Sequence, residues 1–182
     1  MDSTALAAAL KEAAPGAAIE PASSIDSQMT IVVPAGDLPA VAQALRDRKD
    51  LAFDFLAELT AADYWPREPR YELIYILVSI PNKRRLRMKV RLGAADPHVA
   101  TLCRVWPAAN WLEREVWDLF GIAFDGHPDP RRLLMPEDWE GFPLRKDYPV
   151  QIRKTPNAAE PLQVTEEEFR QNVMKDRLTR GR

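Results

Sequence analysis

Residues able to catalyse a reaction or to bind a partner are concentrated between positions 113 and 148. They are acids, bases, one histidine and large aromatic side chains: Glu113, Arg114, Glu115, Asp118, His127, Arg131, Arg132, Trp139, Arg145, Lys146 and Tyr148. Carboxylates and a histidine can transfer protons in catalysis. Trp, Tyr and Arg, in contrast, are the residue types enriched at the energetic centres of protein interfaces. The stretch is therefore either an active site or a recognition surface.

The spacing of the acids argues against catalysis. Glu113 and Glu115 are two residues apart, so on a helix they point to different sides. Arg114 and Asp118 are four residues apart and are placed to pair with each other. We therefore expect ion pairs, within the chain or across an interface, and no catalytic residue. A small enzyme that uses His127 with a nearby acid is the alternative from a different class.

Residues that hold metals or redox groups are scarce in this chain. It contains one cysteine, Cys103, and two histidines, His98 and His127. An iron–sulfur cluster generally takes four thiolates, and neither a zinc pattern nor a glycine-rich phosphate loop is present. We expect no metal and no cofactor in this chain. The single cysteine suits a reducing compartment.

The composition is typical of a globular domain and excludes some partners. Of the 182 residues, 46% are hydrophobic and 29% are charged, with a net charge of -2. This charge gives no general attraction to nucleic acid. No run of about 18–20 apolar residues is available to span a bilayer, and the N-terminus has no basic region typical of a signal peptide. We therefore expect membrane association only through a partner.

Apolar periodicity and turn residues predict an α+β fold. Helices are expected at residues 4–14, 37–49, 107–121 and from Thr165 onward. Strands are expected at residues 29–33, 71–80 and 85–92, the last two as a β-hairpin. Alternation also favours a strand at residues 52–61, although Leu56 and Glu58 would suit a helix turn. The strand at 71–80 is apolar on both faces and should be central. Together these elements predict a two-layer fold in which helices cover one side of a mostly antiparallel sheet.

Two of the expected strands carry patterned faces. In the strand at 52–61, alternation places Phe53, Phe55, Ala57 and Leu59 on one face. The strand at 85–92 places four basic side chains on one face: Arg85, Arg87, Lys89 and Arg91. This basic stripe is either a solvated outer face or a surface that docks an acidic partner. Nucleic acid is disfavoured because no aromatic side chains interleave with the basic ones.

The chain divides by pattern into a body and an arm. Residues 1–124 predict one α+β core domain, whereas residues 125–182 predict an extended, proline-rich arm that ends in a short helix. The arm contains many apolar and aromatic side chains: Leu133, Leu134, Met135, Trp139, Phe142, Leu144 and Tyr148. That is too much apolar surface for a solvated linker. The arm should therefore lie on the domain, on a partner, or on both.

Residues 113–134 follow a signature of fixed spacings. It consists of Glu-Arg-Glu, two variable residues, an acid, two apolar residues, six variable residues, histidine, three variable residues, arginine, one variable residue and two apolar residues. The matching residues are Glu113-Arg114-Glu115, Asp118, Leu119-Phe120, His127, Arg131 and Leu133-Leu134. With this signature, and with the flanking segments 106–111 and 134–149, the chain resembles the 30-kDa subunit of proton-pumping NADH:quinone oxidoreductase, respiratory complex I. The family often has Leu at the place of Pro130 and His at the place of Phe142.

The resemblance implies a subunit of the peripheral arm of that complex. Such a subunit has a structural role in electron transfer from NADH to quinone, which is coupled to proton translocation. It packs against the large quinone-site subunit and against cluster-bearing subunits, and those partners hold FMN and the iron–sulfur clusters. The resemblance also implies a place on the cytoplasmic face of a bacterial inner membrane, with membrane attachment only through the complex.

The arm after Gly121 is then expected to wrap a partner. Its expected anchors are Trp139, Tyr148 and the basic pairs Arg131/Arg132 and Arg145/Lys146. The alternative is a stand-alone protein-binding module of another assembly, with a similar docking arm.

Overall fold

The computed structural model describes residues 2–149 and the single positions 167 and 171. The chain divides into two compact units, residues 1–148 and 149–182. The boundary expected between residues 124 and 125 falls inside the first unit. The helix expected from Thr165 falls outside the described residues, apart from the helical positions 167 and 171. Among the described residues, no helix has both the length and the apolar character needed to cross a membrane.

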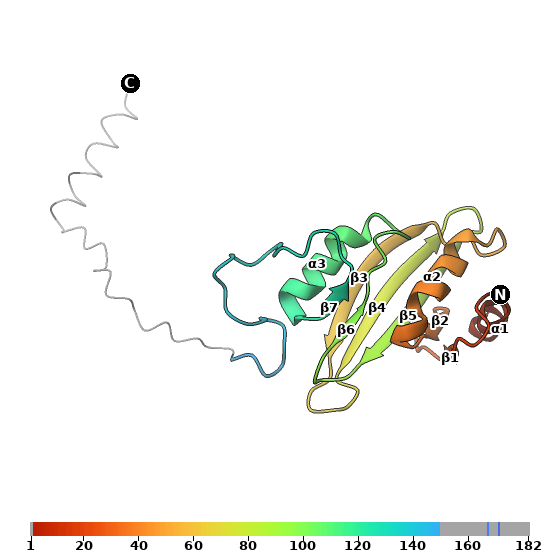
Figure 1. Cartoon of the computed structure of the whole chain (residues 1–182), viewed down its shortest axis with the longest axis horizontal. Coiled ribbons are helices and arrows are strands. Elements are labelled where there is room, and N and C mark those ends of the chain that lie inside the picture. Colours follow the sequence, from red (N-terminus) through yellow and green to blue (C-terminus); the bar gives the residue numbers. More distant parts are fainter. Residues whose placement is uncertain (1, 150–166, 168–170, 172–182) are drawn as a thin grey trace, which may run out of the picture. The chain divides into compact units, whose positions relative to one another are not determined.

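A five-stranded sheet forms the frame of the first unit (Figure 1). In spatial order its strands are β1 (Glu20–Ala22), β2 (Thr30–Val32), β5 (Arg84–Leu92), β4 (Tyr71–Ser79) and β3 (Phe55–Asp63). Neighbouring strands are antiparallel except β2 and β5, which run parallel. Strands β4 and β5 are the predicted hairpin. The predicted α+β class with a mostly antiparallel sheet is confirmed.

Within residues 2–149, three α-helices and one 3-10 turn accompany the sheet. They are α1 (Ser3–Ala13), η1 (Ala35–Asp37), α2 (Leu38–Asp47) and α3 (Ala109–Phe120). Helix α1 begins where the side chain of Asp2 accepts a hydrogen bond from the backbone N–H of Ala5. Asp37 precedes α2 but does not cap it through its side chain, because its carboxylate accepts a hydrogen bond from the backbone N–H of Ala18.

The core lies between the helices and one face of the sheet (Figure 1). On β4 and β5 that face contributes every second side chain: Tyr71, Leu73, Tyr75, Leu77, Leu86, Met88, Val90 and Leu92. Helix α3 adds Val116 and Phe120, and α2 adds Val41 and Leu45. This alternation of buried and more exposed positions follows from the two-residue period of a strand.

Strand β3 departs from its predicted pattern. A bulge interrupts its register with β4 between Leu56 and Glu58. Leu56 and Leu59 consequently face the core, whereas Phe55 lies on the opposite face and is 50% exposed. The expectation that Phe55 shares a face with Leu59 was wrong, because a bulge adds a residue to one strand and shifts its alternation.

A second, small sheet was not predicted. It pairs β6 (His98–Ala100) in parallel with β7 (Ala123–Asp125). Helix α3 ends before β7 at Gly121, whose φ of +72° is a left-handed conformation that glycine adopts without strain. The chain then passes along the helix it has just left. Residues 126–148 continue this path and contact α3 repeatedly.

Candidate partner interface on helix α3

Three charged residues of the signature are buried on helix α3. Glu113, Arg114 and Asp118 are 0%, 7% and 0% exposed. Removing a charge from water costs free energy unless hydrogen bonds or an opposite charge compensate for it. The partners of these three side chains therefore show what the signature does.

Glu113 binds the segment that precedes the helix. Its carboxylate accepts hydrogen bonds from the backbone N–H of Leu102 at 2.7 Å and from the hydroxyl of Thr101. The thiol of Cys103 lies 3.6 Å from the same carboxylate. Burial raises the pKa of Glu113 above its ordinary value, and burial likewise raises the pKa of the Cys103 thiol.

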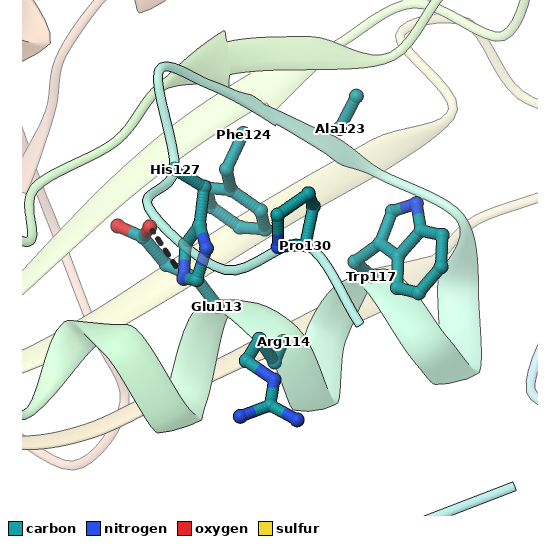
Figure 2. A pocket seen from close by; sticks show the side chains of 7 residues that line it. All are labelled: Glu113, Arg114, Trp117, Ala123, Phe124, His127 and Pro130. Atoms are coloured by element: carbon teal, nitrogen blue, oxygen red, sulfur yellow. Dashed lines mark ion pairs between the residues drawn. The ribbon is translucent and has the colours of Figure 1, made fainter. Parts of the chain in front are cut away.

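His127 also belongs to the cluster around the Glu113 carboxylate. Its Nε2 lies 3.9 Å from Oε2 of Glu113 (Figure 2). Its Nδ1 accepts a hydrogen bond from the backbone N–H of Asp129 at 3.0 Å. In the neutral ring Nε2 then carries the hydrogen, which it donates to the carbonyl oxygen of Asn110 at 3.0 Å. His127 thereby joins the loop after β7 to the first turn of α3.

The same three side chains have the ligand types of a metal site. One ligand atom each from Cys103, Glu113 and His127 lie within 4.8 Å of one another. Coordination through Nε2 of His127 would require a lone pair where the ring hydrogen is already donated to Asn110. These hydrogen bonds fit a buried polar cluster better than a metal site. The expectation that the chain holds no metal stays a prediction.

Arg114 holds the returning loop through the loop's backbone. Its guanidinium donates to the carbonyl oxygens of Arg131 at 2.9 Å and Arg132 at 3.1 Å. It also lies 3.5 Å from the carboxylate of Asp129 and 5.1 Å from the centre of the Trp111 ring. The pairing expected between Arg114 and Asp118 is not formed, because the loop takes up both side chains.

Asp118 binds the next turn of that loop. Its Oδ2 accepts hydrogen bonds from three successive backbone N–H groups, those of Leu133, Leu134 and Met135, at 2.7–3.0 Å. Its Oδ1 accepts a hydrogen bond from Arg132 at 2.7 Å. Burial alone would raise the pKa of Asp118, but these hydrogen bonds outweigh burial and hold the pKa below its ordinary value.

Two arginines of the arm stack on the ring of Phe142. The guanidinium carbons of Arg145 and Arg132 lie 4.6 Å and 5.9 Å from its centre. Arg145 also donates to the carbonyl oxygen of Phe120 at 2.6 Å, which satisfies one of the open acceptors at the end of α3. This packing leaves no space at Gly121, where an added Cβ would lie 2.5 Å from Phe142.

The end of the arm is attached to the sheet by Arg70. Its guanidinium donates to Asp63 on β3 and to Asp147 of the arm, at 2.7–3.0 Å. Asp63 also accepts the backbone N–H of Lys146 at 2.8 Å. The hydrogen bond from Arg70 is the largest influence that lowers the pKa of Asp63, to about 2.

A small cavity opens between α3 and the loop (Figure 2). Its volume is about 110 Å³, and its lining combines apolar and charged side chains: Glu113, Arg114, Trp117, Ala123, Phe124, His127 and Pro130. Binding sites for cofactors and drug-sized ligands measure about 300–1,000 Å³. This cavity has room for one side chain or a few waters only.

Helix α3 and the segments bound to it expose large apolar side chains. Trp111 is 60% exposed, Leu134 is 59% exposed and Leu144 is 48% exposed. Trp111 stacks beside Arg114, and the backbone N–H of Leu134 is held by Asp118. We call Trp111, Leu134 and Leu144 the α3 patch.

The predicted site residues differ in their exposure and in their contacts. Hydrogen bonds that join α3 to the rest of the chain are made by the side chains of Glu113, Arg114, Asp118, His127, Arg132 and Arg145. Arg131 and Lys146 are exposed, and Glu115, Trp139 and Tyr148 are half-buried. Tyr148 donates its hydroxyl to the carbonyl oxygen of Glu140. A partner role for these residues stays a prediction.

Several residues that hold this site together were not predicted from the sequence. Asp63, Arg70 and Asp147 belong to one ion-pair network although 77 residues separate Arg70 from Asp147. Spacing along the chain gives no signal for such a contact. Thr101 and Cys103 were missed for the same reason, because only the folded chain brings them to Glu113.

The fold and the site together define an α+β domain in which the loop after β7 is hydrogen-bonded to helix α3. The helix and this loop both expose apolar side chains. A profile described as "Respiratory-chain NADH dehydrogenase, 30 Kd subunit" matches residues 31–154. The chain therefore belongs to the family of the 30-kDa subunit of respiratory-chain NADH dehydrogenase, the NADH-quinone oxidoreductase of complex I.

Named relatives and solved structures agree with this family. The chain is 44% identical to an NADH-quinone oxidoreductase subunit of Rhizobium meliloti (strain 1021) over 135 residues, 74% of each chain. It is 43% identical to the corresponding subunit of Roseiflexus castenholzii (strain DSM 13941 / HLO8) over 150 residues, 82% of this chain and 86% of the relative. A structure of the trypsin-resistant fragment (1-134) of Nqo5 matches with a TM-score of 0.53 and 36% identity, covering 67% of this chain and 96% of the fragment.

A second structure comes from a differently named complex. A chain of the membrane-bound sulfane sulfur reductase, an archaeal respiratory membrane complex, matches with a TM-score of 0.66 and 25% identity. The match covers 81% of this chain and 85% of that chain.

Proposed function

We propose that this chain is a docking subunit in the peripheral arm of NADH:quinone oxidoreductase and has a structural and assembly role without a redox group of its own. Its partners are the large quinone-site subunit and the cluster-bearing subunits, which hold FMN and the iron–sulfur clusters. The chain lies on the cytoplasmic face of a bacterial inner membrane and is attached to it through those partners. Family membership and the relatives' names support this proposal.

One observation carries the structural role. The charges of the signature form hydrogen bonds inside the chain, and these hold the loop that carries Leu134 on α3, the helix that also exposes Trp111. Both side chains are about three-fifths exposed. Exposed apolar patches that are rimmed by polar residues mark interaction sites. The charges thus shape the surface, and the apolar side chains supply its binding free energy.

The cavity beside Arg114 fits the same role. At about 110 Å³ it suits one inserted side chain of a partner, and well-packed pockets of this kind often receive interface hot spots. Its apolar walls favour an aliphatic side chain. The rival reading of His127 as a catalytic base is disfavoured, because its side chain is 4% exposed and both ring nitrogens make hydrogen bonds.

A second candidate function is supported by the similarity to the sulfane sulfur reductase complex. The same domain would then serve as a docking module of another respiratory assembly. The identity of 25% to that chain is lower than the 44% to the relative from Rhizobium meliloti. We therefore place NADH:quinone oxidoreductase first.

Assembly of a variant that has lost the α3 patch tests the proposal. The tagged chain with Trp111→Ser and Leu134→Ser is produced in place of the natural chain, and native membranes are extracted with detergent. Flavin- and cluster-containing subunits should co-purify with the unchanged chain and fall at least about tenfold with the variant, because two hot spots are lost. The free energy of unfolding of the isolated variant should stay within about 1 kcal/mol, since both side chains are largely exposed.

Trp65→Ser is the matched control, because Trp65 is 55% exposed on the loop between β3 and β4. The control should retain the partners. Full assembly of the double variant would refute a docking role of the α3 patch. Co-purification with subunits that lack flavin would favour the second candidate.

A further inference from the structure

The face of the sheet that points away from the core carries a row of three neighbouring side chains. Phe55 on β3 is paired with Val78 on β4, and Val78 is paired with Arg85 on β5. Paired residues in antiparallel strands lie side by side on the same face. Ile80 follows directly after β4 at the same end. We call Phe55, Val78, Ile80 and Arg85 the outer patch.

The basic stripe on this face is mostly neutralised within the chain. Arg87 pairs with Asp26 at 2.7 Å, and Glu72 pairs with Lys89 at 2.8 Å and lies 3.7 Å from Arg91. These three cations fit the interpretation of a solvated outer face. Arg85 is the exception, because its exposed guanidinium makes no hydrogen bond or ion pair with any residue that the structure describes.

Large apolar side chains flank this unpaired arginine. Phe55 is 50% exposed and Ile80 is 64% exposed, while Val78 is half-buried between its neighbours. The bulge in β3 is the reason that Phe55 lies on this face and not in the core. Phe and Arg are among the residue types that are enriched at protein interfaces.

We propose that the outer patch is a second docking surface, which binds a polypeptide segment that presents an apolar side chain next to a carboxylate. The carboxylate pairs with Arg85, and the apolar side chain packs on Phe55, Val78 and Ile80. Charge also sets the direction in which the segment lies. Glu58, exposed in the next row on β3, repels an acid on that side, so the carboxylate lies on the β5 side.

The charges disfavour nucleic acid as the occupant. One unpaired cation is available in this row, and four acids lie on or beside the same face: Asp26, Glu58, Glu72 and Asp54, whose carboxylate accepts a hydrogen bond from the backbone N–H of Ile80. Binding to a phosphate backbone uses several cations at once. A segment with one carboxylate among apolar side chains matches the surface better.

Photo-crosslinking in the assembled complex tests this proposal. Phe55 is replaced by the photoreactive amino acid p-benzoyl-phenylalanine, the complex is purified from native membranes, and crosslinked peptides are identified by mass spectrometry. We expect one crosslinked segment from another subunit, with an Asp or Glu near the crosslink. The same crosslinker at Lys11, which is exposed on α1, should give no such product.

The contribution of Arg85 is measured in the same chain. Arg85→Glu should lower the crosslink yield at position 55 at least about fivefold by charge repulsion, and Arg85→Lys should retain most of it. No crosslink at position 55, a crosslink to a second copy of this chain, or equal yields in the Glu and Lys variants would each overturn the proposal. Since these positions are separate from the α3 patch, failure here leaves the result of the Trp111 and Leu134 experiment unaffected.

Discussion

Asp118, a residue of the family signature, holds the loop that carries the exposed Leu134. It accepts three backbone N–H groups and one guanidinium while fully buried. We predict that Asp118→Ala lowers the free energy of unfolding by about 3 kcal/mol, because buried donors and a partly buried arginine lose their acceptor. Urea unfolding of the isolated chain measures this change. Arg131→Ala is the control, because the side chain of Arg131 is 76% exposed, and it should change stability by less than about 0.5 kcal/mol.

Burial of Glu113 makes the stability of the folded chain depend on pH. Its folded pKa is raised by burial, so its contribution to stability is fully present below the ordinary value of 4.5 and is lost as pH rises through the folded pKa. The free energy of unfolding of the natural chain minus that of Glu113→Gln should therefore fall as pH increases from about 4 to 8. Urea unfolding across this range tests it. A difference for Glu113→Gln that stays flat across this pH range would contradict the assignment.

At the scale of elements, the end of α3 tolerates little change. Gly121 has a positive φ, and an added Cβ would meet Phe142 at 2.5 Å and Arg145 at 2.6 Å. Gly121→Ala should therefore lower the free energy of unfolding by about 2 kcal/mol or more, from backbone strain and steric overlap. Gly16→Ala is the matched control, because Gly16 also has a positive φ but a Cβ there meets nothing within 4 Å. Equal effects of the two substitutions in thermal unfolding would show that the arm does not pack on Gly121.

The sequence predicts the elements better than it predicts their contacts. The three helices and the β4–β5 hairpin are long enough to show a period, and Gly121 marks the end of α3. Strands β1, β6 and β7 have three residues each, which is too short for alternation to be recognised, whereas the equally short β2 lies in an apolar, β-branched run that indicates a strand by composition. The bulge in β3 and the ion pairs of Arg70 depend on register and on distant residues, so local pattern gives no sign of them.

For the candidate site too, the elements were predictable from the sequence and most of the contacts were not. The signature located the relevant helix and loop, and the expectation that the arm lies on the domain holds for residues 126–148. Which way each charge points was not predictable, because burial of Glu113 and Asp118 depends on a loop that returns from beyond the helix. The anchors expected for a partner, Trp139 and Tyr148 among them, stay a prediction.

At the scale of the whole molecule, the chain presents two apolar patches on different elements. The α3 patch lies on α3 and on the segments bound to it, and the outer patch lies on the sheet face that points away from the core. A protein with two such surfaces can contact two neighbours. We expect the exposed side chains of the α3 patch to become covered on assembly.

Hydroxyl-radical footprinting of Trp111 measures this coverage. Oxidation of Trp111 is quantified by mass spectrometry in the isolated chain and in the purified complex, with Trp65 of the same chain measured alongside. We expect rapid oxidation of Trp111 in the isolated chain, where it is 60% exposed, and at least about tenfold protection in the complex. Oxidation of Trp111 at the same rate in both would show that the α3 patch is not covered by a partner.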